Sequence, residues 1–243
     1  MKIILLTKPP IAGYAKTRLI DPLTAEQAAA VHAAMVRCTT RRLVTAFGGG
    51  DGHDLVLALD HPSPTCGPKV GNWLADAPRE WRIVDQGPGN LGDRLDHIWR
   101  EDADTPTLFF GTDTPDVPLD LLRSIPDQLG GGDACIGPSE DGGYWTLGSH
   151  RRCAELVREI DWGTTSVYHQ TLEAAKRGRL KLQVLDAWND VDDIHDLVLL
   201  RQRLADAGEA ALIDLREDLD SLLGEPHHER PKRPGKRCHG RGA

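Results

Sequence analysis

Residues 108–118 read LFFGTDTPDVP, and this stretch decides the fold. Its opening apolar run is typical of a buried strand, and Gly111 lets the backbone turn directly after it. Pro118 begins an apolar-periodic segment, which predicts a helix. Asp113 therefore follows the carboxyl end of a strand, where open α/β sheets bind ligands and a carboxylate can hold a divalent cation against nucleotide phosphates. The alternative is that Asp113 and Asp116 only cap a turn and a helix.

Strand-like and helix-like patterns alternate on both sides of this stretch. The expected strands cover residues 2–7, 55–59, 81–84, 107–110, 133–137 and 180–185. The expected helices cover residues 24–47, 91–101, 118–129, 167–176, 194–204 and 208–223, with a short one near 70–74. This alternation predicts an α/β fold with three α/β/α layers and a mostly parallel sheet. Around residues 137–148 two strands flank a turn without an intervening helix, so one of them is expected to run antiparallel.

The composition is that of an ordinary globular protein. The chain has 243 residues, of which 40% are hydrophobic and 27% charged. No apolar run approaches the roughly 20 residues of a membrane span, and residues 1–7 fit a first strand better than a signal peptide. The five cysteines are scattered without a CxxC pair. That pattern indicates reduced thiols in the cytoplasm and argues against a disulfide framework or a zinc site.

Charge is unevenly distributed along the chain. The formal net charge is −8, yet residues 225–243 carry six Lys/Arg against two Asp/Glu. These residues lack an apolar pattern, so we expect a basic disordered tail after a single domain at residues 1–224. The rest of the chain is strongly acidic, a poor basis for general nucleic-acid binding. Nucleic-acid binding by the tail alone stays an alternative, although the tail has no aromatic residues.

Three cations follow the first strand in an irregular loop, KPPIAGYAKTRL at residues 8–19. Two prolines and Gly13 exclude regular structure there. Lys8, Lys16 and Arg18 can converge on a phosphate chain, because Lys supplies point charge and Arg a planar fork of donors. The motif is neither a Walker A loop nor a GxGxxG fingerprint. A solvated basic loop explains the same residues equally well.

A second glycine-rich loop, QGPGNLGDRL at residues 86–95, joins a strand to a helix. Glycines let the backbone approach a flat ligand closely, and Gln86 could read the edge of a base. A plain strand-to-helix turn is the alternative. In the long helix that precedes this region, Met35 and His32 are expected to be packing and surface residues.

The stretch PSEDGGYWTLG at residues 138–148 places two acids before a Gly-Gly pair and two aromatic residues. An Asp-Gly hairpin turn would look the same. A hairpin tip, however, has no need of Glu140, Asp141, Tyr144 and Trp145 together. Asp141 or Glu140 is therefore a candidate general base for an acceptor hydroxyl.

The last predicted strand leads into WNDVDDIHDL, residues 188–197. Asp190 and Asp192 could complete a metal site with Asp113 from a neighbouring strand end. Asp192 or Asp193 could instead cap the next helix and interact with its dipole. Carboxylate ligands without Cys or His indicate Mg²⁺ or Mn²⁺.

Six motifs occur in this order: KPPIAGYAKTRL, QGPGNLGDRL, GTDTPDVP, GPSEDGGYWTLG, DWGTTSVY and WNDVDDIHDL. Together they resemble the GT-A-fold family of glycosyltransferases labelled as arsenosugar-biosynthesis or rSAM/selenodomain-associated transferases, over approximately residues 1–205. The first loop is also distantly similar to guanylyltransferases of deazaflavin cofactor synthesis and to molybdenum-cofactor nucleotidyltransferases.

This resemblance implies a nucleotide-diphospho-sugar-transferase-like fold with a nucleotide side and an acceptor side. The residues that would bind the nucleotide and its phosphates are Lys8, Gly13, Lys16, Arg18, Gln86, Gly89 and Arg94. The residues that would face the acceptor, next to Asp141, are Glu140, Gly142, Gly143 and Tyr144.

The resemblance also implies a metal site. Asp113 would be one ligand, and Asp192 matches a second metal-binding acid of some relatives. The usual Thr-Pro after that acid is replaced here by Asp193 and Ile194, which leaves Asp190 as an alternative ligand.

The chemistry follows from the charge that develops. Transfer from a nucleotide creates a diphosphate or pyrophosphate leaving group, which a divalent cation and Lys or Arg stabilise. Lys16, Asp113 and Asp141 are therefore the expected catalytic residues. Two reactions stay open: metal-dependent glycosyl transfer from a nucleotide sugar to a small acceptor, and transfer of a nucleotidyl group from a nucleoside triphosphate to a small phosphorylated acceptor with release of pyrophosphate. A catalytically inactive binding protein on this fold is a third possibility.

Overall fold

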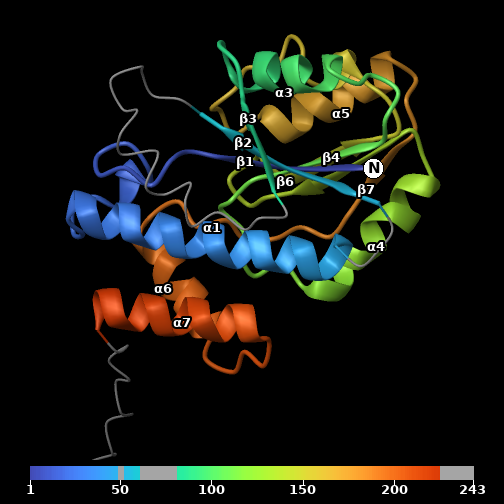
Figure 1. Cartoon of the computed structure of the whole chain (residues 1–243). Helices are drawn as coiled ribbons and strands as arrows, with labels where there is room; N and C mark the ends of the chain where they lie inside the picture. Colours follow the sequence, from blue (N-terminus) through green and yellow to red (C-terminus); the bar gives the residue numbers. More distant parts are fainter. Residues whose placement is uncertain (49–51, 61–80, 225–243) are drawn as a thin grey trace, which may run out of the picture.

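The computed structural model describes residues 1–48, 52–60 and 81–224, and Figure 1 shows how its elements are arranged. Within these residues, seven strands form one sheet in the order β3-β2-β1-β4-β6-β5-β7. The strands are β1 (Lys2–Thr7), β2 (Asp54–Leu59), β3 (Arg82–Asp85), β4 (Thr107–Phe110), β5 (Ala134–Pro138), β6 (Tyr144–Ser149) and β7 (Leu182–Val184). The helices are α1 (Ala25–Phe47), α3 (Leu91–Arg100), α4 (Leu119–Gly130), α5 (Val167–Arg177), α6 (Ile194–Arg203) and α7 (Ala210–Leu223), with short 3₁₀ helices η1 (Thr17–Leu19) and η3 (Ala154–Leu156).

Most of the sheet is parallel. Parallel pairing joins β3, β2, β1 and β4 in a row, and it also joins β5 to β7. β6 runs antiparallel to both of its neighbours, β4 and β5. The chain passes from β5 to β6 through a short turn without a helix. The predicted mostly parallel sheet is thus confirmed, and so is the antiparallel strand in the 137–148 region.

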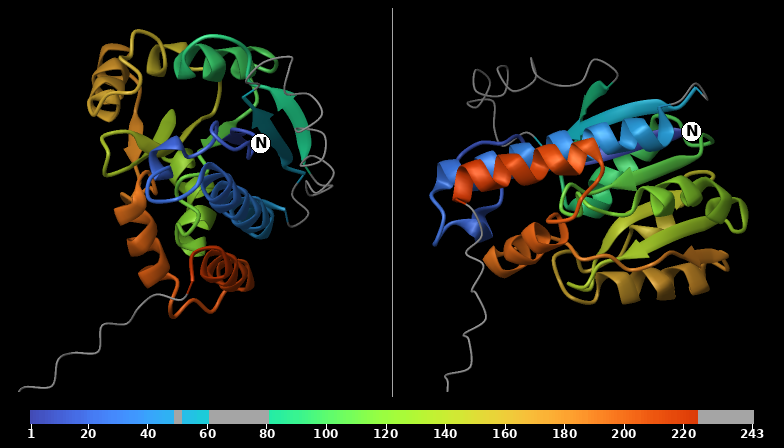
Figure 2. Two further views of the ribbon diagram at one scale, coloured as in Figure 1. Left: turned by 90° about the vertical axis from the view of Figure 1, so that its left-hand side faces the viewer. Right: turned by 90° about the horizontal axis from the view of Figure 1, so that it is seen from below.

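Helices cover both faces of the sheet, as the alternation predicts (Figures 1 and 2). α3 and α5 lie on one face, where Trp99 packs into the core. α1 and α4 lie on the other face, where Leu43 and Ile125 contact the sheet core. The far side of α1 packs against α6 and α7 in a separate apolar cluster that includes Met35 and Leu219. Each fully buried side chain of this size stabilises the fold by roughly 1.5–3 kcal/mol.

Local sequence explains where several helices begin. Thr24, Asn90 and Asp193 each form a capping box, at the starts of α1, α3 and α6 respectively. Asp193 is therefore the residue that caps α6, so the role of Asp192 must be sought elsewhere.

The sequence pattern predicts that Ile194, Leu197, Val198 and Leu204 share one apolar face of α6, and the structure differs at Val198. Leu197, Leu200 and Leu204 are buried in the cluster with α1 and α7, whereas Val198 is 45% exposed. Val198 lies about 100° around the helix from Leu197, outside the buried stripe.

Two expectations lie outside the described residues, namely the short helix near 70–74 and the basic tail at 225–243. In the part of the chain that the structure describes, no helix combines the length and hydropathy needed to cross a bilayer.

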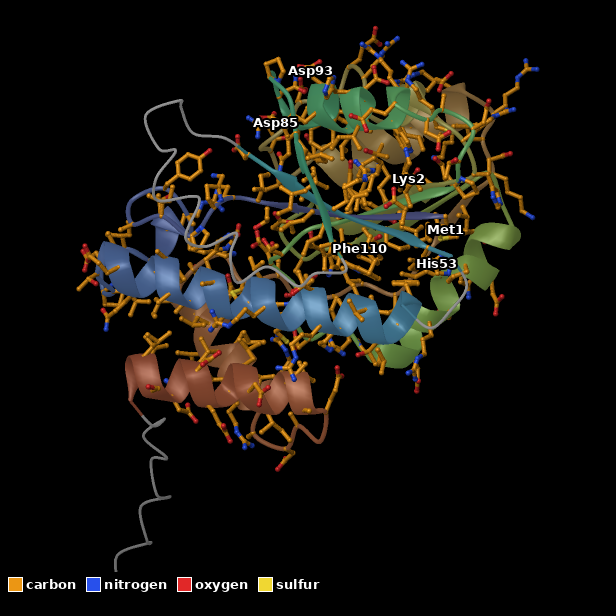
Figure 3. All side chains as sticks on the ribbon, in the orientation of Figure 1. Met1, Lys2, His53, Asp85, Asp93 and Phe110 are labelled. Carbon is orange, nitrogen blue, oxygen red and sulfur yellow. The ribbon has the colours of Figure 1, made fainter. Side chains whose placement is uncertain are left out.

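The carboxyl ends of β1, β2, β3 and β4 meet at one edge of the sheet, because their pairing is parallel. In Figure 3, Asp85 marks the carboxyl end of β3 and Asp93 lies beyond it, away from Met1 and His53 at the opposite ends of β1 and β2. The loops that leave this edge carry most of the predicted site residues.

Candidate active site

A cleft of about 710 Å³ opens at this edge of the sheet. Of the residues predicted to bind nucleotide, Lys8, Lys16, Arg18, Gln86 and Arg94 line the cleft. Of the residues predicted to bind metal or acceptor, Asp113, Asp141, Gly143, Tyr144 and Asp192 line it. The predicted residues outside its lining are Gly13, Gly89, Glu140 and Gly142. The fold thus brings loops that are distant in sequence around one cavity.

The Lys16 side chain joins two of these loops. Its ammonium lies 2.5 Å from Asp113 Oδ1 and also donates to the carbonyl of Val191. The Lys16 side chain is only 6% exposed, whereas that of Asp113 is 45% exposed. Partial burial raises the pKa of the Asp113 carboxyl, but the charge and hydrogen bond of Lys16 outweigh this effect and the net pKa is lowered. Asp113 is therefore ionised and paired.

The other two cations of the first loop are more open to the cleft. Arg18 donates to Asp192 with an Nη1–Oδ2 distance of 2.6 Å, and its side chain is 72% exposed. The Lys8 ammonium lies 5.3 Å from the centre of the Tyr14 ring, a cation–π contact. Gly13 has a φ of +78°, a conformation that favours glycine, and so shapes the turn of this loop. The loop presents positive charge to the cleft from more than one residue.

Three carboxylates in the cleft approach one another closely. One oxygen from each of Asp141, Asp190 and Asp192 lies within 4.8 Å of the others. Burial raises the pKa of Asp190 to about 7, and the nearby charges of Asp141, Asp192 and Asp113 add to the effect. Burial and the charge of Asp113 also raise the pKa of Asp192. Both acids that the sequence offered as alternatives, Asp190 and Asp192, belong to this cluster, and its crowded negative charge favours cation binding.

The β5–β6 turn holds Asp141 in place. Asp141 Oδ1 accepts hydrogen bonds from the Ser139 hydroxyl at 2.6 Å and from the Gly143 N–H at 2.7 Å. Gly142 has a φ of +87°, and a Cβ at this position would lie 2.0 Å from the carbonyl oxygen of Thr165. The turn therefore packs directly against the loop before α5, and only glycine fits at the contact.

Two predicted acceptor residues differ from Asp141 in their surroundings. Glu140 lines a neighbouring cavity of about 230 Å³, which Asp141 and Asp190 also border. Tyr144 lines the main cleft, but its hydroxyl is buried, and burial raises the pKa of that hydroxyl. Its ring packs edge-on against Trp162, with 6.1 Å between ring centres. The aromatic ring is thus the part of Tyr144 that borders the cleft.

Gln86 hydrogen-bonds with the protein itself. Its amide nitrogen donates to the carbonyls of Thr7 at 3.2 Å and Ala58 at 2.9 Å, and its Oε1 accepts from Arg94 at 3.2 Å. The residue is only 4% exposed. These contacts tie the ends of β1 and β2 to α3, so the amide group that was expected to read a base is engaged in supporting the cleft wall.

Asp60 is a cleft residue that sequence reasoning missed. Its Oδ2 lies 2.9 Å from Arg94 Nη1, and both side chains line the cleft beyond the end of β2. Arg94 also donates to the Gly89 carbonyl at 3.0 Å, which fixes its guanidinium. Asp60 directly follows a predicted strand, and the same signal drew attention to Asp113.

His32 also lines the cleft, which corrects the expectation that it is a surface residue. It is 3% exposed, and its Nε2 lies 2.9 Å from the Lys8 carbonyl and 3.2 Å from the Thr7 hydroxyl. Its Nδ1 is buried without a hydrogen-bond partner among the described residues. Burial lowers the pKa of His32, which favours a neutral ring that donates from Nε2 to the Lys8 carbonyl. Its spacing from the buried Ala28, one turn away, was the available signal.

Comparison with solved structures supports an enzyme of the transferase class. A protein from Desulfovibrio desulfuricans G20, provisionally described as a nucleotide-diphospho-sugar transferase, is 28% identical, with a TM-score of 0.76 over 91% of this chain and 95% of that chain. CMP:2-keto-3-deoxy-manno-octonic acid synthetase complexed with CTP is 10% identical, with a TM-score of 0.52 over 84% of this chain and 97% of that chain. The inositol-1-phosphate CTP transferase from T. maritima is 14% identical, with a TM-score of 0.51 over 90% and 96% of the two chains. The last two similarities concern the fold alone.

No curated protein matches the sequence. One family model does match, over residues 43–164, which is just over half of the chain. The matched segment runs from the end of α1 to the loop before α5, and it includes Asp113 and Asp141. The chain therefore belongs to DUF2064, the family described as uncharacterized proteins conserved in bacteria.

Proposed function

We propose that this protein is a metal-dependent glycosyltransferase that transfers a sugar from a nucleotide sugar to a small acceptor. The observation that carries the proposal is the composition of one cleft, in which Lys16 and Arg18 lie beside the carboxylates of Asp141, Asp190 and Asp192. A nucleotide diphosphate needs both kinds of group, cations for its oxygens and carboxylates for its metal ion. The similarity to the Desulfovibrio protein supports this donor class.

The acidic cluster fits a hard divalent cation. Its donors are carboxylate oxygens from Asp141, Asp190 and Asp192, a set that suits Mg²⁺ or Mn²⁺. Burial raises the pKa of Asp190, the negative charges of Asp141, Asp192 and Asp113 add to this effect, and a bound cation would offset that negative charge. When bound, the cation would supply positive charge for the diphosphate leaving group.

The first loop would bind the donor's phosphates. Lys16 is preorganised by its two protein contacts. Arg18 is exposed enough to reach a ligand, either while it keeps its contact with Asp192 or once that contact is broken. Lys8 adds a third positive charge to the same wall. Fixed charges of this kind stabilise a leaving group without reorganising during the reaction.

Asp141 would act on the acceptor as general base. Its Oδ1 is held by Ser139 and Gly143, and the residue itself is exposed to both cavities of the site. The cation would need one carboxylate oxygen of Asp141, and an acceptor hydroxyl that hydrogen-bonds to the other oxygen could lose its proton to it as the new bond forms. Asp141→Asn should therefore lower turnover by roughly 10²-fold or more, and near-normal turnover would remove Asp141 from this role.

The test is the identity of the released product. The protein is incubated with Mn²⁺, a panel of nucleotide sugars or nucleoside triphosphates, and a set of small hydroxylated or phosphorylated acceptors, and the products are followed by phosphorus NMR. Glycosyl transfer releases a nucleoside diphosphate. Asp190→Asn should abolish the release, while Asp218→Asn, the same change at an exposed α7 residue paired with Arg37, should not.

Nucleotidyl transfer is the second candidate. Three cations in the first loop suit a triphosphate as well as a diphosphate, and the solved structures with the same fold include a synthetase complexed with CTP and a CTP transferase. The same experiment decides between the two reactions, because nucleotidyl transfer releases pyrophosphate from a nucleoside triphosphate. Release of neither product with any donor would contradict both candidates.

A further inference from the structure

The Lys16 ammonium has three N–H donors, and the protein uses two of them. One points to Asp113 at 2.5 Å and another to the Val191 carbonyl, while the third has no partner among the described residues. The Lys16 side chain is only 6% exposed yet lines the cleft, and the backbone of this residue is left-handed, with φ +49° and ψ +45°. A long, flexible side chain is thus held in one position with a single donor left for a ligand.

Asp113 holds Lys16 through its main chain as well as its side chain. Its carbonyl accepts from the Val191 N–H at 2.8 Å, and the Val191 carbonyl accepts from Lys16. The three residues form a closed ring of contacts that joins the first loop, the β4–α4 turn and the segment before α6. Any movement of Asp113 would therefore move both groups that restrain the ammonium.

The same pairing makes Asp113 a poor cation ligand. Its negative charge is already offset by an ammonium at 2.5 Å, and a metal ion beside Oδ1 would be repelled by that ammonium. Asp141, Asp190 and Asp192 offer three other carboxylates whose oxygens lie within 4.8 Å of one another without it.

We propose that Asp113 is a positioning residue for Lys16, and that the divalent cation is held by Asp141, Asp190 and Asp192 without Asp113. The inference rests on the proposed function, since it assigns Lys16 to a polyphosphate and the acidic cluster to a metal ion. It divides the cleft into two sites: a neutral Lys16–Asp113 pair whose remaining N–H meets a phosphate oxygen, and a separate carboxylate cluster that binds the cation.

Manganese alone tests the metal half of the inference. Mn²⁺ affinity is measured by titration calorimetry on wild type, Asp113→Asn, Asp190→Asn and Asp218→Asn, with circular dichroism to confirm folding. Asp190→Asn should weaken Mn²⁺ binding by roughly 10-fold or more, because it removes a charged ligand. The Mn²⁺ affinity of Asp113→Asn and of the surface control Asp218→Asn should each stay within about 3-fold of wild type, since neither substitution removes a ligand of the cation. An equal loss in Asp113→Asn and Asp190→Asn would make Asp113 a ligand and overturn the inference.

Inorganic tripolyphosphate without metal tests the positioning half. Lys16→Met should weaken its binding by roughly 10-fold, and Asp113→Asn by about 5-fold, because Lys16 is then poorly oriented. In the Lys16→Met background, Asp113→Asn should cause no further loss, since it acts through Lys16. If the Asp113 carboxylate only repels tripolyphosphate, the effect on affinity has the opposite sign. Asp113→Asn would then strengthen tripolyphosphate binding with Lys16 present, and this result would overturn the inference.

Different results would overturn the proposed function and the inference about Asp113. Wild-type protein that binds neither Mn²⁺ nor tripolyphosphate would overturn the proposed function and this inference with it. Wild-type protein that binds both, combined with either contrary result for Asp113→Asn, would overturn the inference alone.

Discussion

The guanidinium of Arg203 donates to the buried carboxylate of Asp116, with distances of 2.6 Å from Nε to Oδ2 and 3.3 Å from Nη2 to Oδ1. The Trp188 indole N–H donates to the same carboxylate at 3.1 Å. The two acids of the GTDTPDVP motif therefore have different surroundings. Asp113 lines the cleft, whereas Asp116 anchors the turn to α6 and to the segment before it.

Replacement of Asp116 should destabilise the fold. Asp116→Ala removes the acceptor for both Arg203 and Trp188 and leaves their donors partly buried. The expected cost is about 3 kcal/mol, equivalent to a fall in Tm of roughly 6–12 °C for a chain of this size. The matched control is Asp120→Ala, at a fully exposed α4 position. Thermal unfolding that shows the two variants within about 1 kcal/mol of each other would contradict the anchoring role.

Asp96 should produce a distinct acid transition. Burial raises the pKa of its carboxyl, but hydrogen bonds from Arg152, Arg100 and Arg158 outweigh this and lower the pKa to about 2. The folded value lies below the unfolded one, so the stabilisation is present above pH 4 and is lost as the pH falls towards 2. The expected loss is about 2 kcal/mol. Denaturant unfolding between pH 5 and 2 should show this slope in wild type and not in Asp96→Asn; identical slopes would refute it.

His32 should make the free energy of unfolding depend on pH in a second, higher pH range. Burial lowers the pKa of the folded ring below its ordinary value of 6.5, so the unfolded chain takes up a proton that the folded protein resists. Stability should therefore fall as the pH drops below 6.5. His32→Gln removes the titrating group and keeps an N–H donor for the Lys8 carbonyl. If His32→Gln keeps the full wild-type slope between pH 7 and 5, the buried neutral histidine is the wrong description.

Alanine substitutions at Gly142 and Gly163 distinguish the cost of a steric contact from the cost of backbone strain. Gly142 and Gly163 both have positive φ values, +87° and +80°, but only at Gly142 would a Cβ meet another atom, the Thr165 carbonyl oxygen. Gly163→Ala should cost about 1 kcal/mol from strain alone. Gly142→Ala should cost clearly more and should also weaken acceptor-side function, because it displaces the turn that carries Asp141. Equal changes in Tm would show that the contact with Thr165 is unimportant.

Much of the fold could be predicted from local sequence. The apolar run before Gly111 and the periodic segment after Pro118 are β4 and α4, and their order in the chain implies a parallel sheet. The turn between β5 and β6 was visible as an interruption of the alternation. Such features depend on neighbouring residues, so periodicity and turn chemistry are enough to find them.

The candidate site could be predicted only in part. Loops at strand ends identified Lys16, Asp113 and Asp141, but the contact between Lys16 and Asp113 joins segments that only the tertiary fold brings together. His32 was misplaced because histidine is often exposed, although its helical spacing puts it on a buried face. Gln86 was read as a ligand group because sequence does not show that backbone carbonyls already occupy its amide.

The most direct test of the account is ligand-induced stabilisation with and without metal. Unfolding of wild type, Lys16→Met, Asp190→Asn and Asp218→Asn is followed in the presence of nucleotide sugars or nucleoside triphosphates, with Mn²⁺ or a chelator. At about 100 times its dissociation constant, a ligand adds about 2.7 kcal/mol to the free energy of unfolding. We expect that gain for one nucleotide class with Mn²⁺ in wild type and Asp218→Asn, and its loss with the chelator, in Lys16→Met and in Asp190→Asn. If no nucleotide stabilises the wild type, or if all four proteins are stabilised equally, a metal-dependent nucleotide site in this cleft is contradicted.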